Sequence, residues 1–167
     1  MILVTVGSSA APFARLLAAM DGLAPRLGEP VVMQCGRRPY PGRYARSVGY
    51  VAFGAMEELL CRCRALVGHA STGAVLMARR HGKPLVLVAR DPALGETFDD
   101  HQFQTARSLE GRSRMVEVVY DIGGLEAAVR RAQAKADQGL TWEPQPERER
   151  LLAAIRAAVE GPGGGAT

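Results

Sequence analysis

The sequence has no long hydrophobic run. Its apolar stretches, such as 31–33, 85–89 and 115–119, are short, whereas a helix that crosses a bilayer needs about 20 apolar residues. Residues 2–6 are apolar and run directly into a turn without a basic leader, so we interpret them as a first strand rather than a signal peptide. We therefore expect a cytoplasmic protein.

Cysteine and histidine are scarce, with three of each. An odd number of cysteines without a secretory signal argues against a disulfide framework. Cys61 and Cys63 lie two apart in a helical pattern, so their side chains face different ways, and we interpret them as small buried hydrophobic residues. His69, His81 and His101 lack metal-ligand spacing, so no metal site is predicted.

Two common enzyme signatures are also missing. The turn Gly7-Ser8-Ser9 lacks the G-x-G-x-x-G spacing and no acidic residue ends the next strand, which disfavours a Rossmann dehydrogenase. The G-x-S-x-G elbow of serine hydrolases does not occur. The net charge of +4 suits nucleic acid, an anionic membrane or phosphorylated ligands, and does not choose among them.

What is present is a regular alternation of strand and helix patterns. The apolar, β-branched runs predict strands, and the runs with helical spacing predict helices between them. This order predicts an α/β fold, a Rossmann-like parallel sheet with helices on both faces. The strands are expected at 2–6, 31–35, 48–53, 66–68, 85–89 and 115–119, and the helices at 12–23, 55–63, 73–80, 101–109 and 124–136.

The length of 167 residues is most simply that of one domain. We assign it to residues 1–141. Residues 142–146 contain two prolines and are typical of a linker, and a last amphipathic helix is expected within 142–160. The glycine-rich segment 161–167 is expected to be a disordered tail.

One candidate binding loop lies between a buried strand and a helix, at His69-Ala70-Ser71-Thr72-Gly73. Ligands of open α/β sheets bind beyond the carboxyl ends of the strands. Small residues let a ligand approach the backbone, and the free N–H groups of a helix start attract phosphate. Ser71 and Thr72 can add hydroxyl donors. The alternative, that one of them only caps the helix, is left open.

A second candidate loop runs from Arg90 to Gln102, after the most apolar strand. It is dense in carboxylates and amides, which suit the hydroxyl groups of a sugar. The alternative is a solvated loop in which Asp99 or Asp100 caps the next helix, and we expect this for at least one of them.

Arginine alternates with tyrosine at 37–46, as in some single-strand nucleic-acid sites. Because basic and aromatic residues hardly cluster elsewhere, we favour a mobile surface loop over a nucleic-acid site. An anionic membrane or a lipid diphosphate is a further candidate for its ligand.

Together these segments resemble the C-terminal domain of family 28 glycosyltransferases. The match runs from Met1 to about Leu125. The short chain resembles the split, two-subunit members: those of bacterial exopolysaccharide and capsule synthesis, and the small subunit of the eukaryotic transferase that adds the second N-acetylglucosamine to dolichol. The matching segments, in the family's order, are 2–7, 56–57, 69–73, 82–85 and 100–102.

The resemblance implies the C-terminal half of a GT-B enzyme. A membrane-anchored, Rossmann-like partner subunit would supply the other half and recruit a polyprenyl-diphosphate-linked acceptor. The activity implied is inverting transfer of a sugar from a UDP-sugar, without cofactor or metal. The chain would then be cytoplasmic and would be held at the inner face of the membrane as a peripheral protein through its partner. It would bind no nucleic acid. Self-association of the isolated chain is left open.

The resemblance also assigns roles to residues. The first loop would face the donor diphosphate, the second the sugar, and the turn after the first strand the cleft between subunits. The last helix would dock on the partner or on its own sheet. The general base would be His69, Glu96 or a group of the partner. The residues concerned are His69, Ala70, Ser71, Thr72 and Gly73 for the diphosphate, Glu96, Asp100, His101 and Gln102 for the sugar, and Gly7 and Ser8 for the cleft.

One position departs from the family. Many members carry a glutamate four residues after the glycine of the first loop, where it holds the ribose, and here that residue is Met77. A second hypothesis is therefore a non-catalytic nucleotide-sugar-binding subunit or sensor. Residues 93–96, which lead into the charged part of the second loop, resemble the corresponding segment of exopolysaccharide-type members. This resemblance favours a bacterial polysaccharide role.

Overall fold

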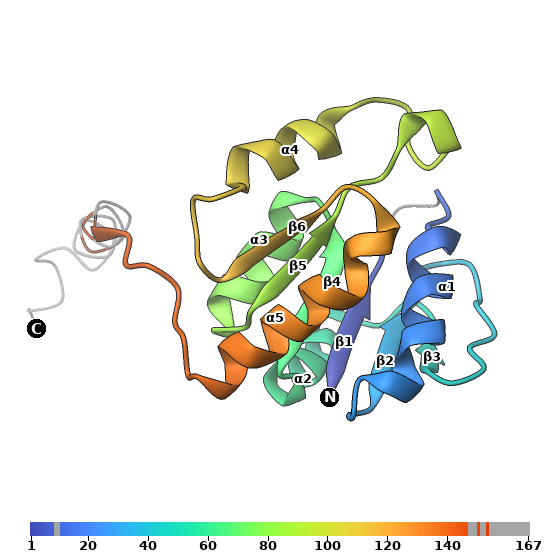
Figure 1. Cartoon of the computed structure of the whole chain (residues 1–167), viewed down its shortest axis with the longest axis horizontal. Helices are drawn as coiled ribbons and strands as arrows, with labels where there is room; N and C mark the ends of the chain where they lie inside the picture. The colour runs from blue at the N-terminus through green and yellow to red at the C-terminus, as the bar shows by residue number, and fades with distance from the viewer. Residues whose placement is uncertain (9–10, 147–149, 151–152, 154–167) are drawn as a thin grey trace, which may run out of the picture.

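The computed structural model describes residues 1–8, 11–146, 150 and 153 (Figure 1). The predicted tail at 161–167, and nearly all of the predicted last helix, lie outside the described residues.

Six parallel strands form one sheet in the order β3-β2-β1-β4-β5-β6. The predicted α/β fold with a Rossmann-like parallel sheet is confirmed. The strands are β1 (Ile2–Thr5), β2 (Val31–Gln34), β3 (Arg46–Val48), β4 (Ala65–His69), β5 (Leu85–Val88) and β6 (Val116–Val119). The helices are α1 (Ala14–Leu23), α2 (Phe53–Arg62), α3 (Thr72–Arg80), α4 (His101–Leu109) and α5 (Leu125–Asp137), with short 3-10 turns at Ala24–Arg26, Pro92–Leu94 and Ile122–Gly124.

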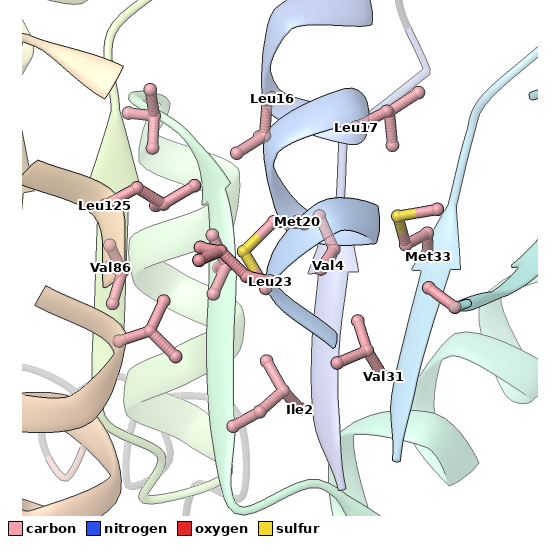
Figure 2. Close-up of a cluster of buried hydrophobic side chains, with 14 of the residues drawn as sticks. Ile2, Val4, Leu16, Leu17, Met20, Leu23, Val31, Met33, Val86 and Leu125 are labelled. Carbon is pink, nitrogen blue, oxygen red and sulfur yellow. The ribbon is translucent and has the colours of Figure 1, made fainter. Parts of the chain in front are cut away.

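Helices cover both faces of the sheet, as predicted. α1 and α5 lie on one face, and α2 and α3 lie on the other with α4 (Figure 1). Alternate strand residues serve the two faces: Ile2 and Val4 pack with α1, while Leu3 packs on the α2 and α3 side (Figure 2). Each such buried side chain contributes about 1.5–3 kcal/mol to folding, so this double burial holds the strand ends in fixed positions.

The third strand is shorter and earlier than the sequence predicted. β3 pairs with β2 from Arg46 to Val48 only, and residues 49–52 pass over the carboxyl edge instead. β2 turns away at Gly36, where φ is +70°, so no partner strand is available beyond Val48. The apolar pattern at 48–53 therefore belongs to a strand end and a loop.

The arginine–tyrosine loop, which the sequence predicts to be a mobile surface loop, is anchored near its end. The carboxylate of Asp21 on α1 accepts hydrogen bonds from the backbone N–H groups of Arg43, Tyr44 and Ala45 at 2.8–2.9 Å. Burial raises the pKa of Asp21, but these three hydrogen bonds together lower it by more than burial raises it. The pKa of Asp21 therefore lies below its usual value. The carboxylate of Asp21 thus fastens the loop to α1.

Within the part of the chain that the structure describes, no helix is both long and apolar enough to cross a membrane.

Candidate functional site

The order in which successive strands are added to the sheet reverses between β1 and β4. β2 and β3 lie on one side of β1, and β4, β5 and β6 lie on the other. The connection after β1 leads to α1 on one face and the connection after β4 leads to α3 on the other, so their loops diverge and leave a crevice. A cavity of about 430 Å³ lies at this point. It is lined by Thr5, Gly7, Ser8, Gln34, Tyr50, Val51, Phe53, Met56, His69, Ser71, Gly73, Ala74 and Met77.

The first wall of the cavity depends on a glycine. Gly7 has φ of +76°, and a Cβ atom there would lie 2.6 Å from Cε1 of His69. Only glycine fits both the left-handed backbone and this close approach. The predicted cleft residues Gly7 and Ser8 and the predicted diphosphate loop are therefore brought together.

The floor of the cavity is polar. The hydroxyl of Thr5 donates to Oε1 of Gln34 at 2.7 Å and accepts from the N–H of Gly7 at 3.2 Å. Both side chains are almost fully buried, so their hydrogen bonds fix the turn that follows β1. Neither residue was singled out in the sequence, because threonine and glutamine at strand ends carry no distinctive signal.

His69 is neutral at physiological pH. Burial lowers the pKa of its imidazole to about 4, helped by the nearby positive charge of Arg90 and opposed by a backbone hydrogen bond with Thr5. Its Nδ1 atom is buried and has no hydrogen-bond partner among the described residues. A neutral imidazole can bind a polar ligand group, but with this pKa it is a weak general base.

The start of α3 presents free backbone donors. Ser71 caps this helix, because its Oγ accepts from the N–H of Ala74 at 3.3 Å. The capping interpretation is therefore confirmed for Ser71, whose own hydroxyl proton stays available. The N–H groups of Thr72 and Gly73 have no partner among the described residues and point out of the helix start, where they favour an anion.

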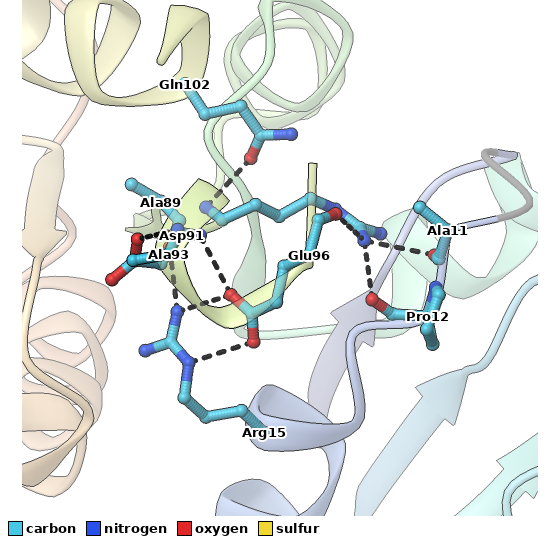
Figure 3. Close-up of polar contacts among 9 residues, drawn as sticks. Ala11, Pro12, Arg15, Ala89, Asp91, Ala93, Glu96 and Gln102 are labelled. Atoms are coloured by element: carbon cyan, nitrogen blue, oxygen red, sulfur yellow. Dashed lines mark hydrogen bonds and ion pairs between the residues drawn. The ribbon is translucent and has the colours of Figure 1, made fainter. Parts of the chain in front are cut away.

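The second predicted loop does not place Glu96 in the cavity. Its carboxylate forms a two-pronged ion pair with Arg15 of α1, with N···O distances of 3.0 and 2.8 Å, and also accepts from the N–H of Asp91 (Figure 3). Glu96 is buried. The structure thus gives it a bracing role, and the predicted roles as base or sugar ligand do not agree with this placement.

Arg90, which the sequence marked only as part of the loop, is buried and organises this edge. Its guanidinium donates to the backbone carbonyls of Ala11, Pro12 and Glu96 at 2.8–3.1 Å (Figure 3). It also donates to the carbonyl of Val6 at 3.1 Å. It therefore ties the loop after β1 to the loop after β5. Sequence reasoning could not find the partners Val6, Ala11 and Pro12, which lie 78–84 residues away in the chain.

The remaining predicted sugar residues open α4. Asp99 accepts from the N–H of His101 at 3.2 Å, while Asp100 holds the N-cap position without a side-chain capping bond, so the predicted side-chain cap is not formed. Asp100 bonds with Gln104, and Gln102 accepts from the N–H of Arg90 at 3.1 Å. Asp100 and His101 are exposed. None of these residues lines the cavity, so their contact with a sugar stays a prediction.

Among the residues that the structure describes, none with a carboxylate lines the cavity, and Met77 lies where the resemblance predicts a ribose-binding glutamate. In the described part of the chain, no group of three or more His, Cys, Asp or Glu side chains could hold a metal ion.

The strand order and the crevice between β1 and β4 define a Rossmann-like, doubly wound α/β domain. The chain belongs to the glycosyltransferase family 28 C-terminal domain, whose family profile matches residues 1–154.

Similar proteins agree with this assignment. The chain is 34% identical over 86 residues to "UDP-N-acetylglucosamine transferase subunit ALG13" of Eremothecium gossypii, covering 51% of this chain and 40% of that protein. The match to the solution structure of ALG13 covers 90% of this chain and 94% of the ALG13 chain, at 20% identity and a TM-score of 0.57. The match to the structure of a kitacinnamycin glycosyltransferase covers 83% of this chain and 36% of that enzyme's chain, at 19% identity and a TM-score of 0.60.

Such structural likeness shows the fold, which is that of one half of GT-B glycosyltransferases. The chain spans 40% of the length of its curated relative.

Proposed function

We propose that this chain is the donor-binding subunit of an inverting glycosyltransferase. It would transfer a sugar from a UDP-sugar to a polyprenyl-diphosphate-linked acceptor, together with a membrane-anchored partner subunit that holds it at the inner face of the membrane. The family assignment supports the reaction class. The observation that carries donor binding is the cavity at the point where the strand order reverses, which the start of α3 lines through Ser71, Gly73 and Ala74.

The site divides into parts that suit the parts of a UDP-sugar. The N–H groups of Thr72 and Gly73 and the hydroxyl of Ser71 suit the diphosphate. Tyr50 and Phe53 are 64% and 67% exposed at the rim, so their rings can stack on a flat base. The neutral imidazole of His69 suits a hydrogen bond to a phosphate or a sugar hydroxyl.

In this proposal the chain stabilises the leaving group. As the acceptor oxygen displaces the UDP from the anomeric carbon, negative charge grows on the diphosphate, and the positive end of α3 stabilises it. No carboxylate lines the cavity among the described residues, and His69 is a weak base. We therefore assign the general base to the partner subunit.

Substitution of Ser71 by aspartate tests the diphosphate site. Aspartate is also a good N-cap, so Ser71→Asp should keep α3 while placing a negative charge where the diphosphate binds. We expect UDP affinity, measured by calorimetry, to fall at least about tenfold, or about 1.4 kcal/mol.

Gly124→Asp is the matched control. Gly124 is the N-cap of α5, its side-chain position is open, and it does not line the cavity. It should leave UDP affinity unchanged. Equal affinities of the two variants for UDP would refute the diphosphate assignment.

The methionine at position 77, where the resemblance predicts a ribose-binding glutamate, favours a second candidate function, a nucleotide-sugar-binding subunit without catalysis. Incubation of the chain with its partner, UDP-sugars and a lipid-linked acceptor separates the two. Product formation supports the transferase. UDP binding without product under every partner condition supports the sensor. The relative from Eremothecium gossypii is a eukaryotic subunit, so the role in bacterial polysaccharide synthesis is a proposal that the acceptor preference will decide.

A further inference from the structure

Three side chains form a connected line at the sheet edge opposite the cavity. Cys61 lies in the last turn of α2, and His81 directly follows α3. Both helices run from the carboxyl edge of the sheet to the amino edge, so their ends meet there. Sγ of Cys61 lies 3.7 Å from Nδ1 of His81, and Nε2 of His81 lies 3.2 Å from Oε1 of Glu57.

The carboxylate sets the tautomer of the imidazole. An ionised carboxylate only accepts hydrogen bonds, so Nε2 of His81 must carry a proton to bind Glu57. In the neutral ring, Nδ1 then presents its lone pair to the thiol of Cys61. Arg80 holds the other oxygen of Glu57 at 3.5 Å, which fixes the orientation. A nucleophile, a base and a group that orients the base are thus aligned.

The thiol is accessible and lies near positive charge. Cys61 is exposed, in contrast to the buried Cys35 and Cys63, so the prediction that the cysteines are buried is wrong for this residue. The last turn of a helix disfavours an anion. Against this, Nζ of Lys83 donates to the carbonyl oxygen of Cys61 at 3.1 Å, which places an ammonium group beside the thiol.

We propose that Cys61 is a reactive thiol, activated by His81 and Glu57, that forms mixed disulfides with low-molecular-weight disulfides. The thiol proton moves to Nδ1 of His81, and the thiolate attacks one sulfur of the disulfide. A new S–S bond forms as the original S–S bond breaks. The released thiolate takes the proton from His81, so a second thiol leaves and the imidazole is neutral again.

The reaction of the full chain with dithiodipyridine tests this proposal, because this disulfide releases a product that absorbs light. Peptide mass analysis identifies the modified cysteine. We expect Cys61 to react at pH 7 about fivefold faster than the same residue in the urea-unfolded chain. A base raises the thiolate fraction, but a less basic thiolate attacks more slowly, which limits the gain to about this size.

Matched variants separate activation from simple exposure. His81→Gln and Glu57→Gln should each slow the reaction of Cys61 while circular dichroism shows a folded chain. Cys63→Ser should keep the fast reaction, and Cys61→Ser should remove it. If Cys61 reacts no faster than in the unfolded chain, or if neither glutamine variant slows it, the proposal is overturned.

Discussion

At the scale of single residues, the contact between Gly7 and His69 shapes the cavity. The left-handed backbone of Gly7 places its Cα against the imidazole of His69. The turn after β1 and the loop after β4 can approach only because no side chain separates them.

Gly7→Ala should therefore destabilise the fold and impair UDP binding. A left-handed alanine costs about 1–3 kcal/mol, and the contact with His69 adds to that cost. Gly28→Ala is the control, since Gly28 has φ of +70° but open space around its Cβ position. Urea unfolding should show a larger loss for Gly7→Ala, and calorimetry should show weaker UDP binding only there. Equal losses in both variants would mean that the contact with His69 is unimportant.

The lowered pKa of His69 predicts acid sensitivity. In the unfolded chain the imidazole takes up a proton as pH falls below about 6.5, whereas the folded chain keeps it neutral down to about pH 4. The stability is therefore complete above pH 6.5 and declines toward pH 4, by at most about 3 kcal/mol. In His69→Gln, urea unfolding at pH 7 and pH 5 should show a smaller difference than in the unchanged chain. An identical pH dependence would argue against a buried neutral His69.

At the scale of elements, the loops at the carboxyl edge are braced by two arginines. Arg90 joins the loops after β1 and β5 through backbone carbonyls, and Arg15 joins α1 to the second loop through Glu96. These contacts hold the loops of the site in place before any ligand binds.

A double-mutant cycle with Arg15→Gln and Glu96→Gln measures this brace. The pair is only 20% and 8% exposed, so we expect a coupling free energy of about 2–3 kcal/mol in urea unfolding. The same cycle at Arg26 and Glu126, which are 59% and 33% exposed, should give a clearly smaller coupling, because solvent screens an exposed pair. Similar coupling in the two pairs would show that burial does not strengthen the brace.

Sequence patterns predicted the elements of this fold better than its site. Helix and strand patterns are local, and the α4 prediction of 101–109 agrees with the structure to the residue. The partners of Arg90 lie 78–84 residues away in Val6 and Pro12, and no local pattern encodes such a contact. The charged second loop therefore looked like a ligand site, although Glu96 is held by Arg15.

At the scale of the whole molecule, exposed hydrophobic side chains follow two of the strands at the carboxyl edge of the sheet. Tyr50 and Phe53 follow β3, and Leu94 and Phe98 follow β5. Exposed apolar groups at a binding edge are typical of a protein–protein interface. Tyr50 and Phe53 line the donor cavity, so we expect the proposed partner subunit to cover Leu94 and Phe98.

Phe98→Ser tests this expectation. Phe98 is fully exposed, so its replacement should change the free energy of unfolding by less than about 0.5 kcal/mol. The affinity for the partner subunit should fall at least about fivefold, or 1 kcal/mol. Leu76→Ser on α3, another exposed apolar residue, is the control and should keep the affinity. Unchanged partner binding in Phe98→Ser would remove this loop from the interface.

The central place of β1 in the sheet also affects how the chain folds. β1 is synthesised before β4, yet β4 is one of its two neighbours, with Ile2 opposite Ala65. Such distant pairing slows folding, and on the ribosome β1 must wait with one open edge until β4 emerges. During that interval the strand that later supports the cavity floor has an unpaired edge, which exposes the nascent chain to misassembly.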